Sequence, residues 1–104
     1  MNESDNLIQR VRDRLSAERK IVSELNATMK NDSIKLLLKR ASDSLDDVEN
    51  IFLLSAEKER RTPEALRMWL SATDLIFEIA ARQRKVVEKA LATFGPDAVA
   101  IHPR

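Results

Sequence analysis

Acidic side chains gather near the middle of the chain, at Asp43, Asp46 and Asp47. On a helix, Asp43 and Asp47 lie one turn apart, and carboxylates at this spacing bind divalent metal ions in several all-helical enzymes that act on phosphate esters. Such a site also needs matching acids from a facing helix. The one similar pair, Asp74 and Glu78, belongs to the polar side of its own segment. We interpret the cluster as a solvated helix face that supplies candidate metal ligands only.

Three arginines, Arg60, Arg61 and Arg67, surround the predicted start of a helix at Thr62. Free N–H groups and the helix dipole favour anions at such a start, which makes this the best candidate anion-binding site. A DNA-binding helix would instead collect many cations on one face. The chain balances 18 basic against 17 acidic residues, for a net charge of +1. We expect no nucleic-acid partner and keep a nucleic-acid-associated regulator as an alternative function.

Three polar residues occupy positions where the apolar pattern predicts a core, namely Glu18, Thr73 and Gln83. Buried polar groups need hydrogen-bond partners. A layer that joins Glu18 to Gln83 or to an arginine would fix the register or the oligomeric state of a bundle, as single polar core residues do in coiled coils. A carboxyl group that does chemistry in a pocket is the functional alternative. We favour a third interpretation, in which Glu18 reaches the surface.

The composition removes most other kinds of chemistry. The absence of cysteine excludes thiolate nucleophiles, disulfides, zinc fingers and iron–sulfur clusters. One histidine, His102, cannot form a multi-histidine metal site, and one glycine, Gly95, cannot form a phosphate-binding glycine-rich loop. We therefore expect no cofactor. No apolar run approaches the length of a membrane span and no signal-peptide pattern is present, so we expect a cytoplasmic protein without a membrane partner.

The elements that carry these residues are helices. Apolar residues of the first segment recur every three or four positions in a coiled-coil-like stripe, and the stripe changes phase at Asn31-Asp32-Ser33. Thr62-Pro63 favours a new helix start, although a long helix kinked at the proline is an alternative. Gly95 suits a helix end. The sequence thus predicts three helices, at about residues 4–30, 33–60 and 63–94, and an irregular tail over residues 95–104.

Short connections between long helices place neighbours antiparallel, so we predict an all-α, up-down-up bundle that forms one domain over residues 1–94. This architecture resembles that of the all-helical chorismate mutases, three-helix chains of about this length that form intertwined dimers. Their first helix carries an arginine, a second arginine nearly five turns on, and a lysine about three turns later. From Arg10 the second position falls at Ala27, and no other arginine satisfies the series. We therefore do not extend this activity to the chain.

The predicted bundle carries more apolar surface than three helices can bury. Between residues 66 and 81, the polar residues form one narrow stripe and almost all others are apolar. The second helix shows the same surplus near its end. Exposed apolar patches of this kind mark interaction sites, and most oligomers are twofold dimers. We expect self-association through the second and third helices, with these candidate interface residues: Leu36, Ile51, Leu53, Leu54, Met68, Trp69, Leu70, Leu75 and Phe77.

These observations favour a non-catalytic function. We expect a small interaction or regulatory module that binds a second copy of itself, with a dimer favoured, or another helical protein. A small all-α enzyme or ligand-binding protein with a site between helices is the second alternative, beside the nucleic-acid-associated regulator.

Overall fold

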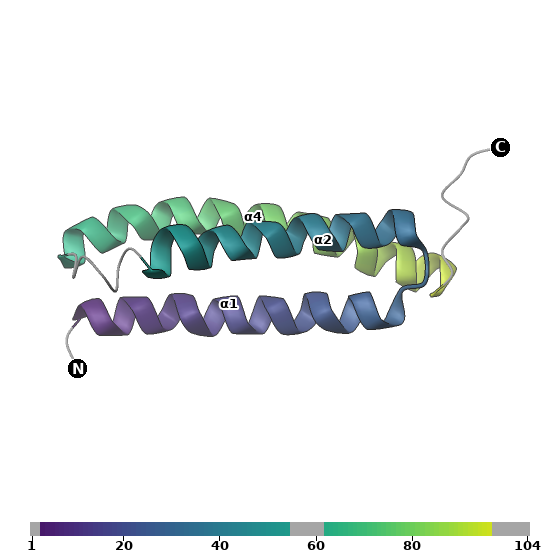
Figure 1. The fold of residues 1–104 in the computed structure, drawn as a ribbon, viewed down its shortest axis with the longest axis horizontal. Helices are drawn as coiled ribbons and strands as arrows, with labels where there is room; N and C mark the ends of the chain where they lie inside the picture. Colours follow the sequence, from purple (N-terminus) through teal and green to yellow (C-terminus); the bar gives the residue numbers. More distant parts are fainter. Residues whose placement is uncertain (1–2, 55–61, 97–104) are drawn as a thin grey trace.

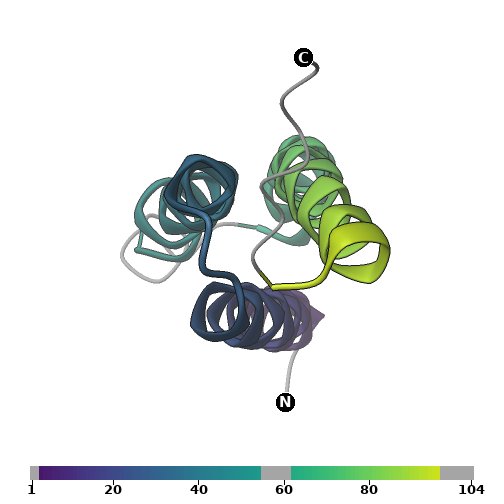
Figure 2. The same ribbon diagram turned by 90° about the vertical axis from the view of Figure 1, so that its right-hand side faces the viewer.

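The chain folds into the predicted all-α bundle of three helices. The computed structural model describes residues 3–54 and 62–96, of which 93% are helical and none lies in a strand. Figures 1 and 2 show the three helices side by side in an up-down-up arrangement, at the corners of a triangle when seen end-on. The bundle is slender, with extents of 54 × 21 × 18 Å. Its elements are α1 (Glu3–Thr28), α2 (Asp32–Asp47), the π-helical η1 (Val48–Leu53) that continues α2, and α4 (Pro63–Phe94).

Side-chain caps set the start of the second and third helices. The Asn31 side chain accepts a hydrogen bond from the Ile34 N–H at 3.1 Å and so caps the start of α2. The apolar pattern of the sequence changes phase at this residue. Thr62 is extended, with φ −65° and ψ 157°, and its hydroxyl accepts from the Ala65 N–H at 3.3 Å. Pro63 is then the first helical residue of α4, so the alternative of one kinked helix through Pro63 is wrong. The predicted extension of the second helix to residue 60 lies outside the described residues.

An apolar seam runs the length of the bundle, and every helix contributes to it. Each helix presents residues spaced three or four positions apart to this seam, because that spacing keeps side chains on one face. Helix α1 contributes Leu7, Val11, Leu15 and Val22. The largest fully buried side chains come from α2, η1, α4 and the residue that follows α1, and are Met29, Leu38, Leu45, Val48, Phe52, Leu66, Phe77 and Val87. Phe77 is 1% exposed, and the guanidinium of Arg14 lies 4.4 Å from the centre of its ring. Phe77 therefore belongs to the core of one chain, which corrects its assignment to an interface.

The π-helical turn of η1 changes which residues face the core. The Leu54 N–H bonds to the carbonyl of Glu49, five residues earlier, which is the π-helical pattern. In this wider turn Phe52 and Leu53 are both buried, at 2% and 6% exposure, together with Val48. Ile51 and Leu54 stay on the outside. The prediction that Leu53 belongs to an interface is therefore wrong, because it assumed a uniform α-helical rotation through this turn.

The end of α4 is tied to the connection between α1 and α2. Gly95 has a positive φ of 79°, and its N–H donates to the Leu91 carbonyl at 2.9 Å. The Lys30 N–H donates to the Pro96 carbonyl at 2.9 Å. Gly95 therefore turns the chain back toward the other two helices, as its position after the last helical residue suggested.

We expect Gly95→Ala to lower the free energy of unfolding by about 1–2 kcal/mol, because an L side chain is strained at this positive φ. A Cβ added here would meet no atom within 4 Å, so crowding would not contribute to the loss. Urea unfolding followed by circular dichroism measures the change, with Thr93→Ala as a control on the exposed end of the same helix. Equal stability of Gly95→Ala and the unchanged chain would contradict the positive φ.

Candidate interaction surface

A line of large apolar side chains follows the outer side of α4. Met68, Leu75, Ile79 and Val86 are 77%, 62%, 49% and 56% exposed. Their steps of seven, four and seven residues keep them on one face of a helix. The exposed Ala72 falls on the same face between the first two. We call the four large residues the α4 stripe.

The α4 stripe is exposed because α4 has no helix on that side. Its core face carries Leu66, Phe77 and Val87, all at most 1% exposed, and these pack toward α1 and α2. The stripe lies roughly opposite this core face on the helical wheel. Large apolar residues in a continuous line on a helix surface are typical of contact with another chain.

Charged side chains run along one flank of the α4 stripe. The row begins with Arg67, which is paired with Glu3 of α1. From Asp74 onward it changes from acidic to basic along the helix. We call this part the charged flank, and its members are Asp74, Glu78, Arg82, Lys85 and Lys89. Asp74 accepts a hydrogen bond from Arg14 of α1 at 2.7 Å. The other members of the charged flank make no ion pair with any part of the chain that the structure describes.

The structure divides the remaining predicted interface residues into three groups. Trp69 and Leu70 are partly buried and pack against the core, so they offer only an edge to a partner. Leu53 and Phe77 are core residues, as described above. The exposed members are Leu36, Ile51, Leu54, Met68 and Leu75.

Ile79 and Val86 complete the stripe, although neither was among the predicted interface residues. The signal that finds them is present in the sequence, since each lies 11 residues after Met68 or Leu75, and 11 residues make three helical turns. Leu36 is exposed on α2 but stands apart, because Arg40 and Asp43 occupy the next turns of its face. The continuous apolar surface therefore belongs to α4.

Glu18 finds its partner in Arg84 rather than in Gln83. Two hydrogen bonds of 2.9 and 3.0 Å join the guanidinium to the Glu18 carboxylate, and a third of 2.6 Å joins it to Glu88. The side chains of Glu18 and Arg84 are only 15% and 14% exposed. Hydrogen bonding to Glu18 raises the pKa of Arg84 above its ordinary value, so the guanidinium stays charged. Glu18 is therefore partly buried, and the structure favours the alternative of a Glu–Arg pair over the expectation that Glu18 reaches the surface.

The other two predicted members of the polar layer lie apart from this pair. The Thr73 hydroxyl donates to the Leu70 carbonyl of its own helix at 2.9 Å. Gln83 has a buried Oε1 that accepts no hydrogen bond from the described residues. Thr73 and Gln83 therefore do not build a continuous layer with Glu18.

The acidic cluster of α2 serves as a set of ion-pair partners. Arg19 of α1 donates to Asp46 at 2.8 Å and to Glu49 at 2.6 Å, and hydrogen bonding to Glu49 raises the pKa of Arg19. Asp43 and Asp47 are exposed. Across residues 3–54 and 62–96, no three acidic or histidine side chains converge in a way that could hold a metal ion.

The predicted anion site is described only in part. Arg60 and Arg61 lie outside the described residues. Arg67 forms an ion pair with Glu3 of α1, so its charge already has a partner.

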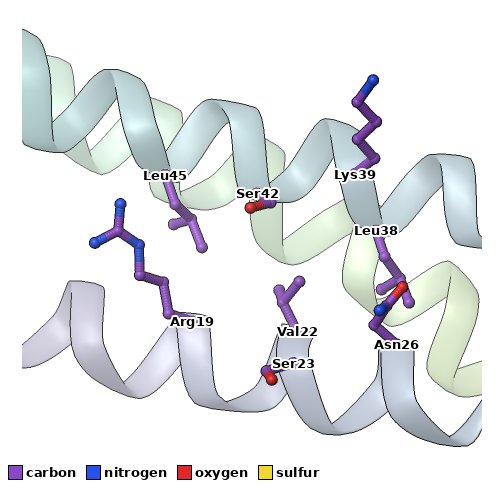
Figure 3. A pocket seen from close by; sticks show the side chains of 8 residues that line it. All are labelled: Arg19, Val22, Ser23, Asn26, Leu38, Lys39, Ser42 and Leu45. Atoms are coloured by element: carbon purple, nitrogen blue, oxygen red, sulfur yellow. The ribbon is translucent and has the colours of Figure 1, made fainter.

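A shallow groove of about 420 Å³ separates α1 from α2. Figure 3 shows Val22, Leu38 and Leu45 pointing into the space between the two helices, with polar side chains around them. The polar lining residues are Arg19, Ser23, Asn26, Lys39 and Ser42. Arg19 is engaged with α2, and the remaining groups are hydroxyls, an amide and one amine, without a carboxylate or imidazole to move protons. The groove is therefore a weaker candidate site than the α4 stripe.

Comparisons with known proteins do not identify a relative. No protein-family model, no curated protein and no solved structure matches this chain. In the part of the chain that the structure describes, no helix has the length and apolar character needed to cross a lipid bilayer. The function has to be inferred from the surfaces themselves.

We expect Glu18→Ala to lower the free energy of unfolding by about 2–3 kcal/mol, because it leaves the little-exposed Arg84 guanidinium with one carboxylate fewer. Replacing both partners, as Glu18→Met with Arg84→Met, should restore stability to within about 1 kcal/mol, since neither charge is then buried. Chemical unfolding measures both variants.

Asp46→Ala is the matched control for this pair. Its side chain is 53% exposed and Arg19 keeps Glu49, so the loss should stay below about 1 kcal/mol. A Glu18→Ala loss no larger than that of Asp46→Ala would show that Glu18 and Arg84 behave as a surface pair.

Proposed function

We propose that this chain is a non-catalytic protein–protein interaction module that self-associates through the outer face of α4. One observation carries the proposal: α4 buries a complete apolar face within its own bundle and still exposes the α4 stripe on the opposite side. A helix that only had to complete a three-helix core would carry polar residues there. The same module could regulate a process by offering this face to another helical protein.

The spacing of the α4 stripe suits a helix as the partner. The steps of seven and four residues repeat every 11 residues, which corresponds to about 3.67 residues per turn. This period is close to that of a straight α-helix, so the stripe stays on one side of α4 over five turns. A partner helix can therefore lie along α4 with little supercoiling.

The size of the stripe favours association that depends on concentration. Full burial of a Leu, Ile, Val or Met side chain is worth about 1.5–3 kcal/mol, and the stripe residues are already half covered or less. Four residues from each of two copies then supply roughly 8–12 kcal/mol before the entropy of association, which costs about 4 kcal/mol or more, is subtracted. We expect a dimer that dissociates on dilution.

The two other functions drawn from the sequence gain no comparable support. A nucleic-acid-associated regulator would rest on exposed lysines and arginines that are spread over several helices, and a small enzyme or ligand-binding protein would rest on the shallow groove of Figure 3. A cytoplasmic location stays a prediction, based on the composition.

We expect Leu75→Glu to shift the chain from dimer to monomer, because each copy then brings a carboxylate into the proposed apolar contact. Light scattering on a sizing column, over a series of protein concentrations, measures the molar mass. Leu75 is 62% exposed, so circular dichroism and the unfolding midpoint of the monomer should change little.

Leu36→Glu is the matched control for the stripe. It introduces the same charge at an exposed leucine of α2 that lies outside the α4 stripe, and it should leave the dimer intact. Dimers of equal strength in the Leu75→Glu variant and the unchanged chain would contradict a role of the stripe in self-association.

A further inference from the structure

We infer that the occupant of the α4 stripe is the α4 helix of a second copy, packed antiparallel about a twofold axis near residue 80. This inference rests on the proposed function and adds the identity and direction of the partner helix. Three features of the described residues carry it: the order of charges along the charged flank, the absence of ion pairs at most of them, and the residues on the opposite flank of α4.

The charges of the charged flank are complementary to those of a second, antiparallel copy of the same flank. Its acidic part, Asp74 and Glu78, precedes Ile79, and its basic part, Arg82, Lys85 and Lys89, follows it. A twofold axis perpendicular to two antiparallel helices brings the same flank of each helix to the same side of the contact. The acidic part of one copy therefore meets the basic part of the other, and each contact occurs twice.

The apolar residues agree with the same register. If Leu75 lies opposite Val86 of the second copy, Ile79 lies within one turn of its own symmetry equivalent. Glu78 is then within one residue of the level of Arg82 of the second copy, because the two positions are reversed about the axis. Asp74 comes within one turn of Lys85 in the same way. One antiparallel register therefore brings the apolar residues of the two stripes together and also places opposite charges near each other.

A parallel pair does not use these charges. In a parallel twofold pair, the charged flank of one helix faces the opposite flank of the other. That opposite flank carries Trp69 and Ile76, which are partly buried against the core, together with Gln83, and none of the three is charged. Glu78, Arg82 and Lys85 would then find no opposite charge across the contact.

The charges supply direction rather than most of the affinity. Exposed ion pairs contribute little free energy each, whereas complementary charges select orientation and suppress other registers. Glu78, Arg82, Lys85 and Lys89 form no ion pair within residues 3–54 and 62–96, so their charges are available to a second copy.

Site-specific disulfide formation tests the direction, because the chain has no cysteine of its own. Chains with Leu75→Cys and with Val86→Cys, one of them enlarged by a tag, are mixed and oxidised gently. Cysteine is itself a small apolar residue, so both variants keep the stripe. The antiparallel register predicts that the mixed disulfide exceeds each of the two like-with-like disulfides several-fold, since only opposed residues come within bonding distance.

The outcomes separate this inference from the proposed function. A dimer by light scattering that yields mainly like-with-like disulfides would be parallel, which overturns the inference and leaves the interaction module standing. A chain that is a monomer at every concentration overturns both.

A charge exchange gives a second test of the register. Glu78→Arg alone should weaken the dimer about tenfold, because two attractive contacts become repulsive. Arg82→Glu alone should weaken it similarly, and the two changes together should restore it. Asp47→Arg is the control, because it changes the net charge equally on the exposed side of α2. Failure of the double variant to recover the affinity of the unchanged chain would overturn the pairing of Glu78 with Arg82.

Discussion

A helix in a three-helix bundle can bury only the side that faces its two neighbours, and α4 carries more apolar residues than that side holds. Phe77 and Val87 fill the core side to 1% exposure or less, whereas Leu75 and Val86 remain more than half exposed on the other side. Because α4 is the longest helix of the bundle, this surplus extends along most of the molecule. The slender shape follows from the same constraint, since one seam of side chains holds all three helices together.

The two contacts that α4 makes within the chain differ in kind. Toward α2 it packs chiefly through apolar residues, whereas its contact with α1 includes a series of ion pairs at successive heights. Glu3 meets Arg67 near the start, and Glu18 meets Arg84 further along. These pairs advance in the same direction on both helices, which fixes the parallel alignment of α1 with α4. These ion pairs also occupy the side of α4 that faces α1. The side that carries the α4 stripe is therefore the one that a partner can contact.

Much of this fold could be predicted from the sequence because it depends on local chemistry. The phase change at Asn31 and the proline after Thr62 mark the helix starts where the structure has them. The π-helical turn could not be predicted, since a periodicity argument assumes the same rotation for every residue and so placed Leu53 outside. The ion-pair partner of Glu18 could not be predicted from the sequence for a different reason. Long side chains such as Arg84 reach across helices, and their contacts depend on relative rotations that one helix does not reveal.

The residues of the candidate surface could be predicted only in part from the sequence. A helix with apolar residues on most of its circumference must expose some of them, but the sequence does not say which, and Phe77 was therefore placed with Leu75. Once the core side is known, the 11-residue spacing assigns Ile79 and Val86 to the opposite side without further information. The charges then become informative as well. Glu78 and Arg82 differ in sign and lie one turn apart beside the same stripe, so reversing the helix exchanges their places. A surface that is complementary to its own reverse needs no second kind of chain to satisfy it, which is the physical reason to look first for a partner of identical sequence.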